Sequence, residues 1–247
     1  MQQPTRRAQF AHFLLHKVRE MRFRLSELGN VCQNSRHRFE AGDPPASGDG
    51  RLVNFHFAAF SSLIQTIKDT LPVVSGQELT WSGISDVRHM RFMHAVRNAI
   101  THDGNPVVNL WADGRFYIAC DFVRLDSRGK PVEFKAPAED IETLAVQFTD
   151  DLCSYLRSVL SPLRGNQALS GPLYGAEFFD NAINHPAVPV FAKNLYAGAD
   201  RSAVEQSRAD PVTELLSELS ALASYCDAQG HAAQQTVEAG ASLGPAT

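Results

Sequence analysis

The chain has 247 residues, 44% of them hydrophobic and 20% charged, and a formal net charge of -4, a composition typical of a globular protein with a sizeable core. It contains no apolar run of about 18 residues, and its first residues, MQQPTRRAQF, lack the apolar segment of a secretory signal, so we expect a cytoplasmic protein with no membrane partner. The four cysteines form no CxxC pair, so the sequence suggests neither a zinc knuckle nor a disulfide framework.

The charge is distributed unevenly along the chain. Residues 1–39 contain eight Arg and Lys against two Glu, a net charge of +6, whereas residues 139–247 have a net charge of -9. A basic end can attract polyanions even in an acidic protein. Six side chains of the first predicted helix form either a nucleic-acid surface or a solvated helix face: Arg6, Arg7, Lys17, Arg19, Arg22 and Arg24.

Apolar residues at three- and four-residue steps predict four helices in the first two thirds of the chain. Gly29-Asn30 is expected to end the first helix, Pro72 the second and Asp103-Gly104 the third, while Ser85 is expected to cap the start of the third. The turn-rich residues 40–50 form a loop. The helices cover about residues 5–28, 54–71, 85–102 and 138–161.

Between the third and fourth helices the period of the pattern changes. The runs PVVNLWA, RFYIACDFVRL and PVEF, joined by turns at Asp113-Gly114 and DSRGK, predict a three-stranded antiparallel β-meander at about residues 106–135. The middle run carries Arg115, Tyr117 and Arg124 among apolar residues. It forms either an RNA platform or, as we prefer, a half-buried strand that covers the helices.

The C-terminal third is predicted to be helical. Asp210-Pro211 has the order of a cap followed by an N1 proline, and it opens a last helix that reaches about Asp227. We therefore predict a mainly α (α+β) protein: a helical bundle over residues 1–165 that includes the β-insertion, a helical extension over 166–228 that packs on it, and a disordered tail over 229–247.

The third predicted helix separates its residues into two arcs. Phe92, Met93, Val96, Ala99 and Ile100 share an apolar arc that faces a core, because successive residues of a helix are rotated by about 100°. The complementary arc has no Lys or Glu, the usual solvating pair, but carries residues suited to phosphate binding and proton transfer: Arg91, His94, Arg97, Asn98, Thr101 and His102. A plain solvated face, or side chains that satisfy helix-end carbonyls, are the alternative interpretations.

The hexapeptide RNAITH, residues 97–102, resembles the Arg-x4-6-His signature of HEPN domains, in the form where a polar residue follows the arginine. The resemblance best covers residues 5–160. It implies an α-helical bundle that forms a homodimer, with the motif helices of two copies (here residues 85–102) facing each other across a composite cleft. Many such proteins are metal-independent endoribonucleases of toxin, antiphage or RNA-processing systems.

The resemblance implies a role for each motif residue. His102 would take a proton from a ribose 2′-hydroxyl, so that this oxygen attacks the adjacent phosphate and leaves a 2′,3′-cyclic end. Arg97 would hold the phosphate with its guanidinium, and Asn98 would orient His102 or bind a phosphate oxygen. Arg91, His94 and Thr101 are candidate RNA contacts. We expect no metal and no cofactor. The expected partners are RNA, a second copy of the chain and a cognate antitoxin or regulatory protein.

Two alternatives remain open. A catalytically silent HEPN-like module would use the same helix face to bind RNA, a nucleotide or a protein. A metal enzyme is disfavoured because His94 and His102 are eight residues apart, about 12 Å along a helix. The sequence also departs from toxins that are modified on a tyrosine two residues after the histidine, because Gly104 occupies that position.

Overall fold

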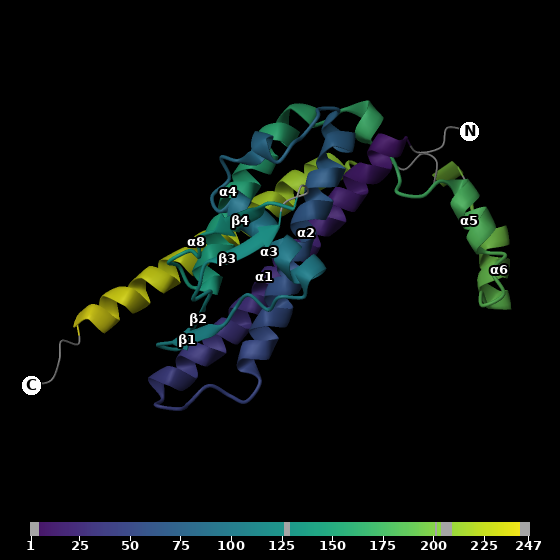
Figure 1. The fold of residues 1–247 in the computed structure, drawn as a ribbon. Coiled ribbons are helices and arrows are strands. Elements are labelled where there is room, and N and C mark those ends of the chain that lie inside the picture. Colours follow the sequence, from purple (N-terminus) through teal and green to yellow (C-terminus); the bar gives the residue numbers. More distant parts are fainter. Residues whose placement is uncertain (1–4, 126–128, 201, 204–208, 243–247) are drawn as a thin grey trace, which may run out of the picture.

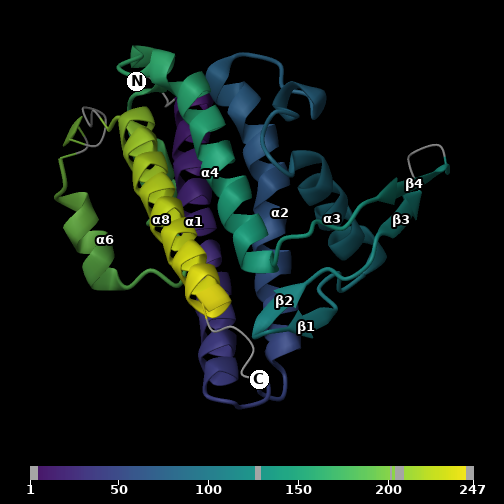
Figure 2. The ribbon, with the colours of Figure 1, turned by 90° about the vertical axis from the view of Figure 1, so that its left-hand side faces the viewer.

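Four helices form the centre of the protein. The computed structural model describes residues 5–125, 129–200, 202–203 and 209–242, with the backbone alone for 231–242. The central helices are α1 (Arg6–Glu40), α2 (Asp49–Ser75), α4 (Ile141–Leu160) and α8 (Pro211–Ser242). They lie side by side, with contacts between α1 and α2, between α1 and α8 and between α4 and α8 (Figure 2). The described chain is therefore mainly α-helical, as the sequence predicts.

The core of this bundle is built from the apolar stripes of the four helices. Phe60 of α2 and Phe148 of α4 are fully buried and meet edge to face, with 6.3 Å between ring centroids, a favoured geometry for aromatic pairs. Around them pack the buried side chains of α1 and α8, among them Leu14, Val18, Met21, Leu25, Val212, Leu215, Leu219 and Leu222. The last helix is thus part of the bundle core and not an extension laid over it.

Two predicted helix ends are wrong. The helix α1 continues past Gly29, which is buried, and a Cβ on this residue would lie 3.3 Å from the hydroxyl of Tyr225. Gly29 therefore permits close packing of α1 on α8 and does not stop the helix. The helix α2 likewise contains Pro72 and runs on to Ser75, where Gly76 ends it in the left-handed conformation.

The third helix begins later than predicted. A single 3-10 turn, η1 (Ser82–Ile84), comes first, and α3 spans Met90–Asp103, so Ser85 is not its N-cap. Residues 88 and 89 instead bind α4, where the backbone N–H of Arg88 donates to Asp151 and the ring of His89 hydrogen bonds to Gln147. These contacts hold His89 at φ 61°, and the helix starts directly after it.

The predicted β-meander is also wrong, because the strands form two separate antiparallel hairpins. The run RFYIACDFVRL breaks in the middle, where the Ala119 N–H donates to the side chain of Asn109 and the Asp121 carboxylate accepts from Lys135 and from the Ala136 backbone. The strands are β1 (Leu110–Ala112), β2 (Arg115–Tyr117), β3 (Phe122–Leu125) and β4 (Pro131–Phe134), paired β1 with β2 and β3 with β4.

The first hairpin covers the bundle. Phe116 is buried in the core, and so is Ile118 just beyond β2, while Arg115 forms an ion pair with Asp140 at 2.8 Å. This supports the half-buried strand and not the RNA platform.

The segment between α4 and α8 projects from the bundle (Figure 1). Its base is fixed by the ring of His12, which hydrogen bonds to the Gly171 carbonyl, and by the Gly171 N–H, which donates to Ala209. Asp210 caps α8 as predicted, accepting from the N–H of Thr213. The helix α8 extends to Ser242, whereas the sequence predicted a tail from residue 229; residues 243–247 lie outside the described chain. Within this segment η2 (Ser161–Leu163) packs on α4 and η3 (Gln167–Leu169) packs on α1, whereas α5 (Ala176–Ala182) and α6 (Val190–Ala197) stand away from the bundle.

The opposite charges of α1 and α8 pair along the surface where the two helices meet. Arg19 and Arg22 of α1 form ion pairs of 3.1–3.2 Å with Glu214 and Glu218 of α8. Other basic side chains of α1 also have partners on their own or a neighbouring helix, since Lys17 and Arg24 pair with Glu20, and Arg7 donates to the Val74 carbonyl. This pairing favours a structural role for the basic face of α1 over a nucleic-acid surface. No helix in the described residues is long and apolar enough to cross a membrane.

Candidate functional site

The helix α3 lies between α2 and the second hairpin (Figure 2). Its predicted apolar arc is confirmed, because Met93, Val96 and Ala99 are buried in the core. Phe92, at the edge of this arc and only partly buried, meets Phe122 of β3 edge to face, with 5.9 Å between ring centroids. These contacts fix the rotation of α3 and leave its polar arc on the outside of the bundle.

Four side chains of the polar arc are joined by hydrogen bonds, and we call them the Arg97 cluster: Arg97, Asn98, His102 and His94. Arg97 Nη1 lies 2.8 Å from Asn98 Oδ1 and 3.2 Å from His102 Nε2. Asn98 Nδ2 in turn lies 3.0 Å from His94 Nε2. The structure thus brings together all three residues predicted to be catalytic, together with His94.

The arginine sets the direction of every bond in this cluster. A guanidinium only donates, so Asn98 Oδ1 and His102 Nε2 must accept. The Asn98 amide then presents Nδ2 to His94, whose Nε2 accepts in turn. Both histidines are therefore neutral in this arrangement, with their protons on Nδ1. Burial and the positive charge of Arg97 lower the pKa of His94, which agrees with this assignment.

Sequence reasoning missed two further members of the site. The indole of Trp81 stacks on the ring of His94, with 3.8 Å between centroids and 16° between planes. The ammonium of Lys68 on α2 lies 5.5 Å from the indole centroid, within range of a cation–π contact. Trp81 precedes η1 in a connecting segment without periodicity, so no local pattern could have placed it on α3.

The end of α3 leaves His102 accessible. Gly104 ends the helix in the left-handed conformation at φ 66°, and Asp103 forms a bidentate ion pair with Arg124 of β3 at 2.6 and 3.0 Å. This pair holds the pKa of Asp103 below its ordinary value and ties the hairpin to the helix end. His102 itself is exposed. Arg97 has unused donor capacity, because its buried Nε–H has no hydrogen-bond partner in the described part of the chain.

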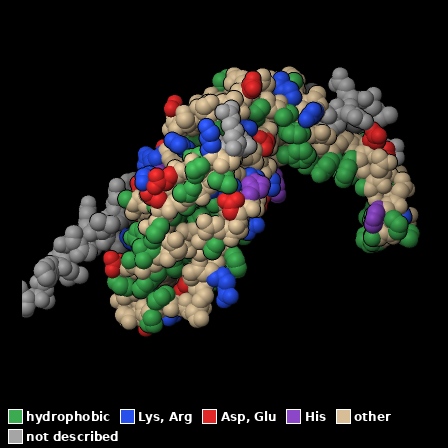
Figure 3. Space-filling view, viewed as in Figure 1, with side chains coloured by type: hydrophobic (Ala, Val, Ile, Leu, Met, Phe, Trp, Pro, Cys, Tyr) green, Lys and Arg blue, Asp and Glu red, His purple; other side chains and the backbone are tan. Residues whose placement is uncertain are grey.

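The other two predicted RNA contacts are not members of the Arg97 cluster. The guanidinium of Arg91 sits over the ring of Phe134, 6.0 Å from its centroid, and therefore faces the hairpin. Thr101 is exposed beside His102. On the surface in Figure 3, histidine side chains gather near the middle of the face, close to both acidic and basic side chains.

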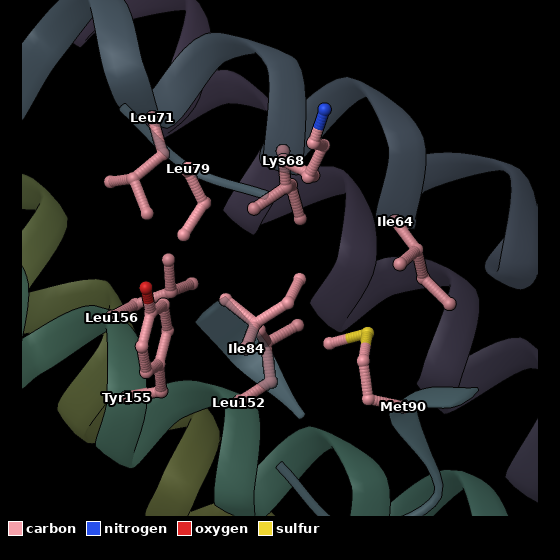
Figure 4. A pocket seen from close by; sticks show the side chains of 10 residues that line it. Ile64, Lys68, Leu71, Leu79, Ile84, Met90, Leu152, Tyr155 and Leu156 are labelled. Atoms are coloured by element: carbon pink, nitrogen blue, oxygen red, sulfur yellow. The ribbon is translucent and has the colours of Figure 1, made fainter. Parts of the chain in front are cut away.

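A small pocket lies behind the site, between α2, α4 and the segment that leads into α3. Its lining is mostly aliphatic, from Leu71, Leu79, Ile84 and their neighbours, and only the alkyl stem of Lys68 reaches it while the ammonium points away (Figure 4). Apart from the Tyr155 hydroxyl, this lining offers no polar group to a phosphate. In the residues that the structure describes, no group of three or more His, Cys, Asp or Glu comes together as a candidate metal site.

Comparison with protein-family models, with curated proteins and with solved structures finds no match to this chain. The resemblance to HEPN domains therefore rests on the RNAITH motif of the sequence.

Proposed function

We propose that the protein is a metal-independent endoribonuclease of the HEPN type, which cuts RNA by attack of a ribose 2′-hydroxyl on the adjacent phosphate. The observation that carries this proposal is the contact of 3.2 Å between Arg97 Nη1 and His102 Nε2 at an exposed helix end. It puts a phosphate-binding cation and a neutral imidazole within reach of one scissile phosphodiester.

The same contact suggests how substrate would activate the site. In the free protein the lone pair on His102 Nε2 accepts from Arg97. A phosphate oxygen is a charged and therefore stronger acceptor, so it would draw the guanidinium away and free Nε2. His102 would then take the 2′-hydroxyl proton as the 2′-oxygen bonds to phosphorus. The bond from phosphorus to the 5′-oxygen breaks, and the leaving oxygen takes a proton from solvent.

We further propose that two copies share the active site, as the resemblance implies. The second hairpin covers one side of α3 through Phe122 and Phe134, so a second copy would approach the open end that carries His102. Val123 and Leu125 of β3 are 62% and 66% exposed on the outer face of this hairpin. Exposed apolar side chains of this kind suit a protein contact.

The chemistry is tested by incubating the protein with mixed RNA in EDTA and analysing the fragment ends. Cleavage to 2′,3′-cyclic phosphates that is lost in Arg97→Ala and His102→Ala, and kept in the exposed control variants Arg51→Ala and His16→Ala, supports the proposal. Unchanged cleavage in the two site variants contradicts the site assignment. RNA that is bound and not cut would favour a catalytically silent binding module.

The shared site is tested with a mixed dimer of one Arg97→Ala copy and one His102→Ala copy, purified through two different tags. Each variant alone should be inactive. If the Arg97 and His102 that touch within one copy act as a pair, the mixed dimer should stay inactive. Recovered cleavage would contradict that pairing and would mean that an arginine of one copy acts with a histidine of the other. A chain that is a strict monomer by mass measurement in solution would rule out the composite cleft.

A further inference from the structure

The side chain of His94 does more than fill space beside α3. It stacks on Trp81 and accepts from Asn98 at the same time. The stack fixes the plane of the imidazole, and the hydrogen bond uses the nitrogen that lies nearest the motif. A ring held in this way presents its lone pair in one direction only.

The consequence falls on the Asn98 amide. A carboxamide can turn by 180° about its last bond, which exchanges Oδ1 and Nδ2 at little cost unless its neighbours distinguish the two ends. Here both ends are distinguished, because Arg97 donates to one and His94 accepts from the other. If His94 could not accept, only the bond from Arg97 would hold the amide, and the Nδ2 end would have lost its partner.

We propose that Trp81 and His94 are positioning residues, which fix the Asn98 amide and through it hold the Arg97 guanidinium beside His102. This inference rests on the proposed ribonuclease function for its effect on rate, although the arrangement itself can be tested without RNA. Neither residue belongs to the RNAITH motif. His94 lies one helical turn before Asn98, and Trp81 lies on the segment that precedes η1.

The charges around His94 keep it in the accepting form. Burial lowers the pKa of His94, and so do three cations that face it, namely Arg97 from its own helix, Arg124 from β3 and Lys68 from α2. Arg124 is itself paired with Asp103. Protonation of His94 would remove the acceptor and place a fourth positive charge in the group, so the positioning effect should weaken in acid.

The test uses two substitutions that separate stacking from hydrogen bonding. His94→Phe keeps an aromatic ring for Trp81 and loses the acceptor, whereas His94→Gln offers an acceptor again. We expect kcat for RNA cleavage to fall about 10- to 100-fold in His94→Phe, because small displacements of catalytic groups cost rates of this size, with KM nearly unchanged and partial recovery in His94→Gln. Adding Asn98→Ala to His94→Phe should lower kcat little further, since both residues act by positioning the Arg97 guanidinium.

Several outcomes would overturn the inference. Wild-type kcat in a folded His94→Phe protein would do so, as would full additivity with Asn98→Ala. A change confined to KM would make His94 an RNA contact. Circular dichroism melting of each variant separates these outcomes from loss of the fold.

An independent readout keeps this inference distinct from the proposed function. Side-chain nitrogen NMR of the histidines should show the His94 proton on Nδ1, and His94→Phe should shift the His102 ring signals while the control His16→Ala does not. A proton on His94 Nε2 would refute the arrangement. If wild-type protein cleaves no RNA and the NMR result holds, the arrangement stands and the ribonuclease proposal fails. If His94→Phe cleaves RNA at the wild-type rate, the ribonuclease proposal stands and the positioning role of His94 fails.

Discussion

Replacing Asp140 with alanine should remove two interactions at once, because this carboxylate both caps α4 and pairs with Arg115. Its Oδ1 accepts from the backbone N–H groups of Glu142 and Thr143 at 3.0 Å, and its Oδ2 accepts from Arg115 at 2.8 Å. The side chains of the ion pair are only 15% and 9% exposed. The contact fastens the first hairpin to the bundle.

The expected loss follows from these two roles. An N-cap aspartate contributes about 1 kcal/mol relative to alanine, and leaving one partner of a buried ion pair alone costs about 3 kcal/mol at the lower end of the measured range. Asp140→Ala should therefore lower the free energy of unfolding by about 4 kcal/mol. Asp140→Asn keeps an oxygen for the cap and loses the charge, so it should lose about 2 kcal/mol.

The assay is urea unfolding followed by circular dichroism at pH 7, with the slope against urea compared between variants. Arg51→Ala, an exposed arginine on α2, is the control and should leave the midpoint unchanged. Equal losses in Asp140→Ala and Asp140→Asn would refute the cap contribution. A loss below about 1 kcal/mol in Asp140→Ala would refute the reasoning on the buried pair, since the cap alone accounts for that much.

Three further predictions concern the turn, the site and the ion pairs. Gly114→Ala should lower the free energy of unfolding in urea by about 2 kcal/mol or more, because Gly114 has a φ of 75° and a Cβ on it would lie 2.9 Å from the Cβ of Phe39. Wild-type stability of this variant would contradict the turn geometry. Because the pKa of His94 is lowered in the folded chain, the unfolded chain binds a proton more readily, so the free energy of unfolding should fall as pH falls through about 6.5. In thermal melts from pH 7.5 to 5.5 the Tm of His94→Gln should fall less than that of the wild type. Equal falls in Tm would exclude His94 as the cause. Arg19→Glu faces Glu218 at a half-exposed position, so it should lower the Tm slightly in low salt and recover in 0.5 M NaCl; a loss independent of salt would indicate packing instead.

The parts of the fold that could be predicted are those where the apolar periodicity within one helix shows which of its faces is buried. The apolar arc of α3 is such a case, because Met93, Val96 and Ala99 recur with the helical period and are buried together. The ends of helices were less predictable. Gly29 and Pro72 look like stop signals, but one is used for close packing against Tyr225 and the other is tolerated inside α2.

The same limit applies to the site. Arg97, Asn98 and His102 could be placed together because their spacing on one helix determines their neighbourhood. Trp81 and Lys68 come from other segments, and only the packing of α2 and η1 against α3 brings them near His94. The break between β2 and β3 is also tertiary in origin, since it depends on Asn109 capturing the Ala119 N–H.

The pairing of α1 with α8 has a consequence for the order in which the molecule can be made. The ribosome makes α1 well before α8, yet the buried residues Leu215, Leu219 and Leu222 of α8 complete the core to which α1 belongs. Until these residues emerge, the nascent chain has a stretch of apolar surface on α1 without its final cover, and the arginines of that helix lack their glutamate partners. The bundle therefore closes only after α8 has been synthesised, and a nascent chain stalled before α8 should need protection from aggregation.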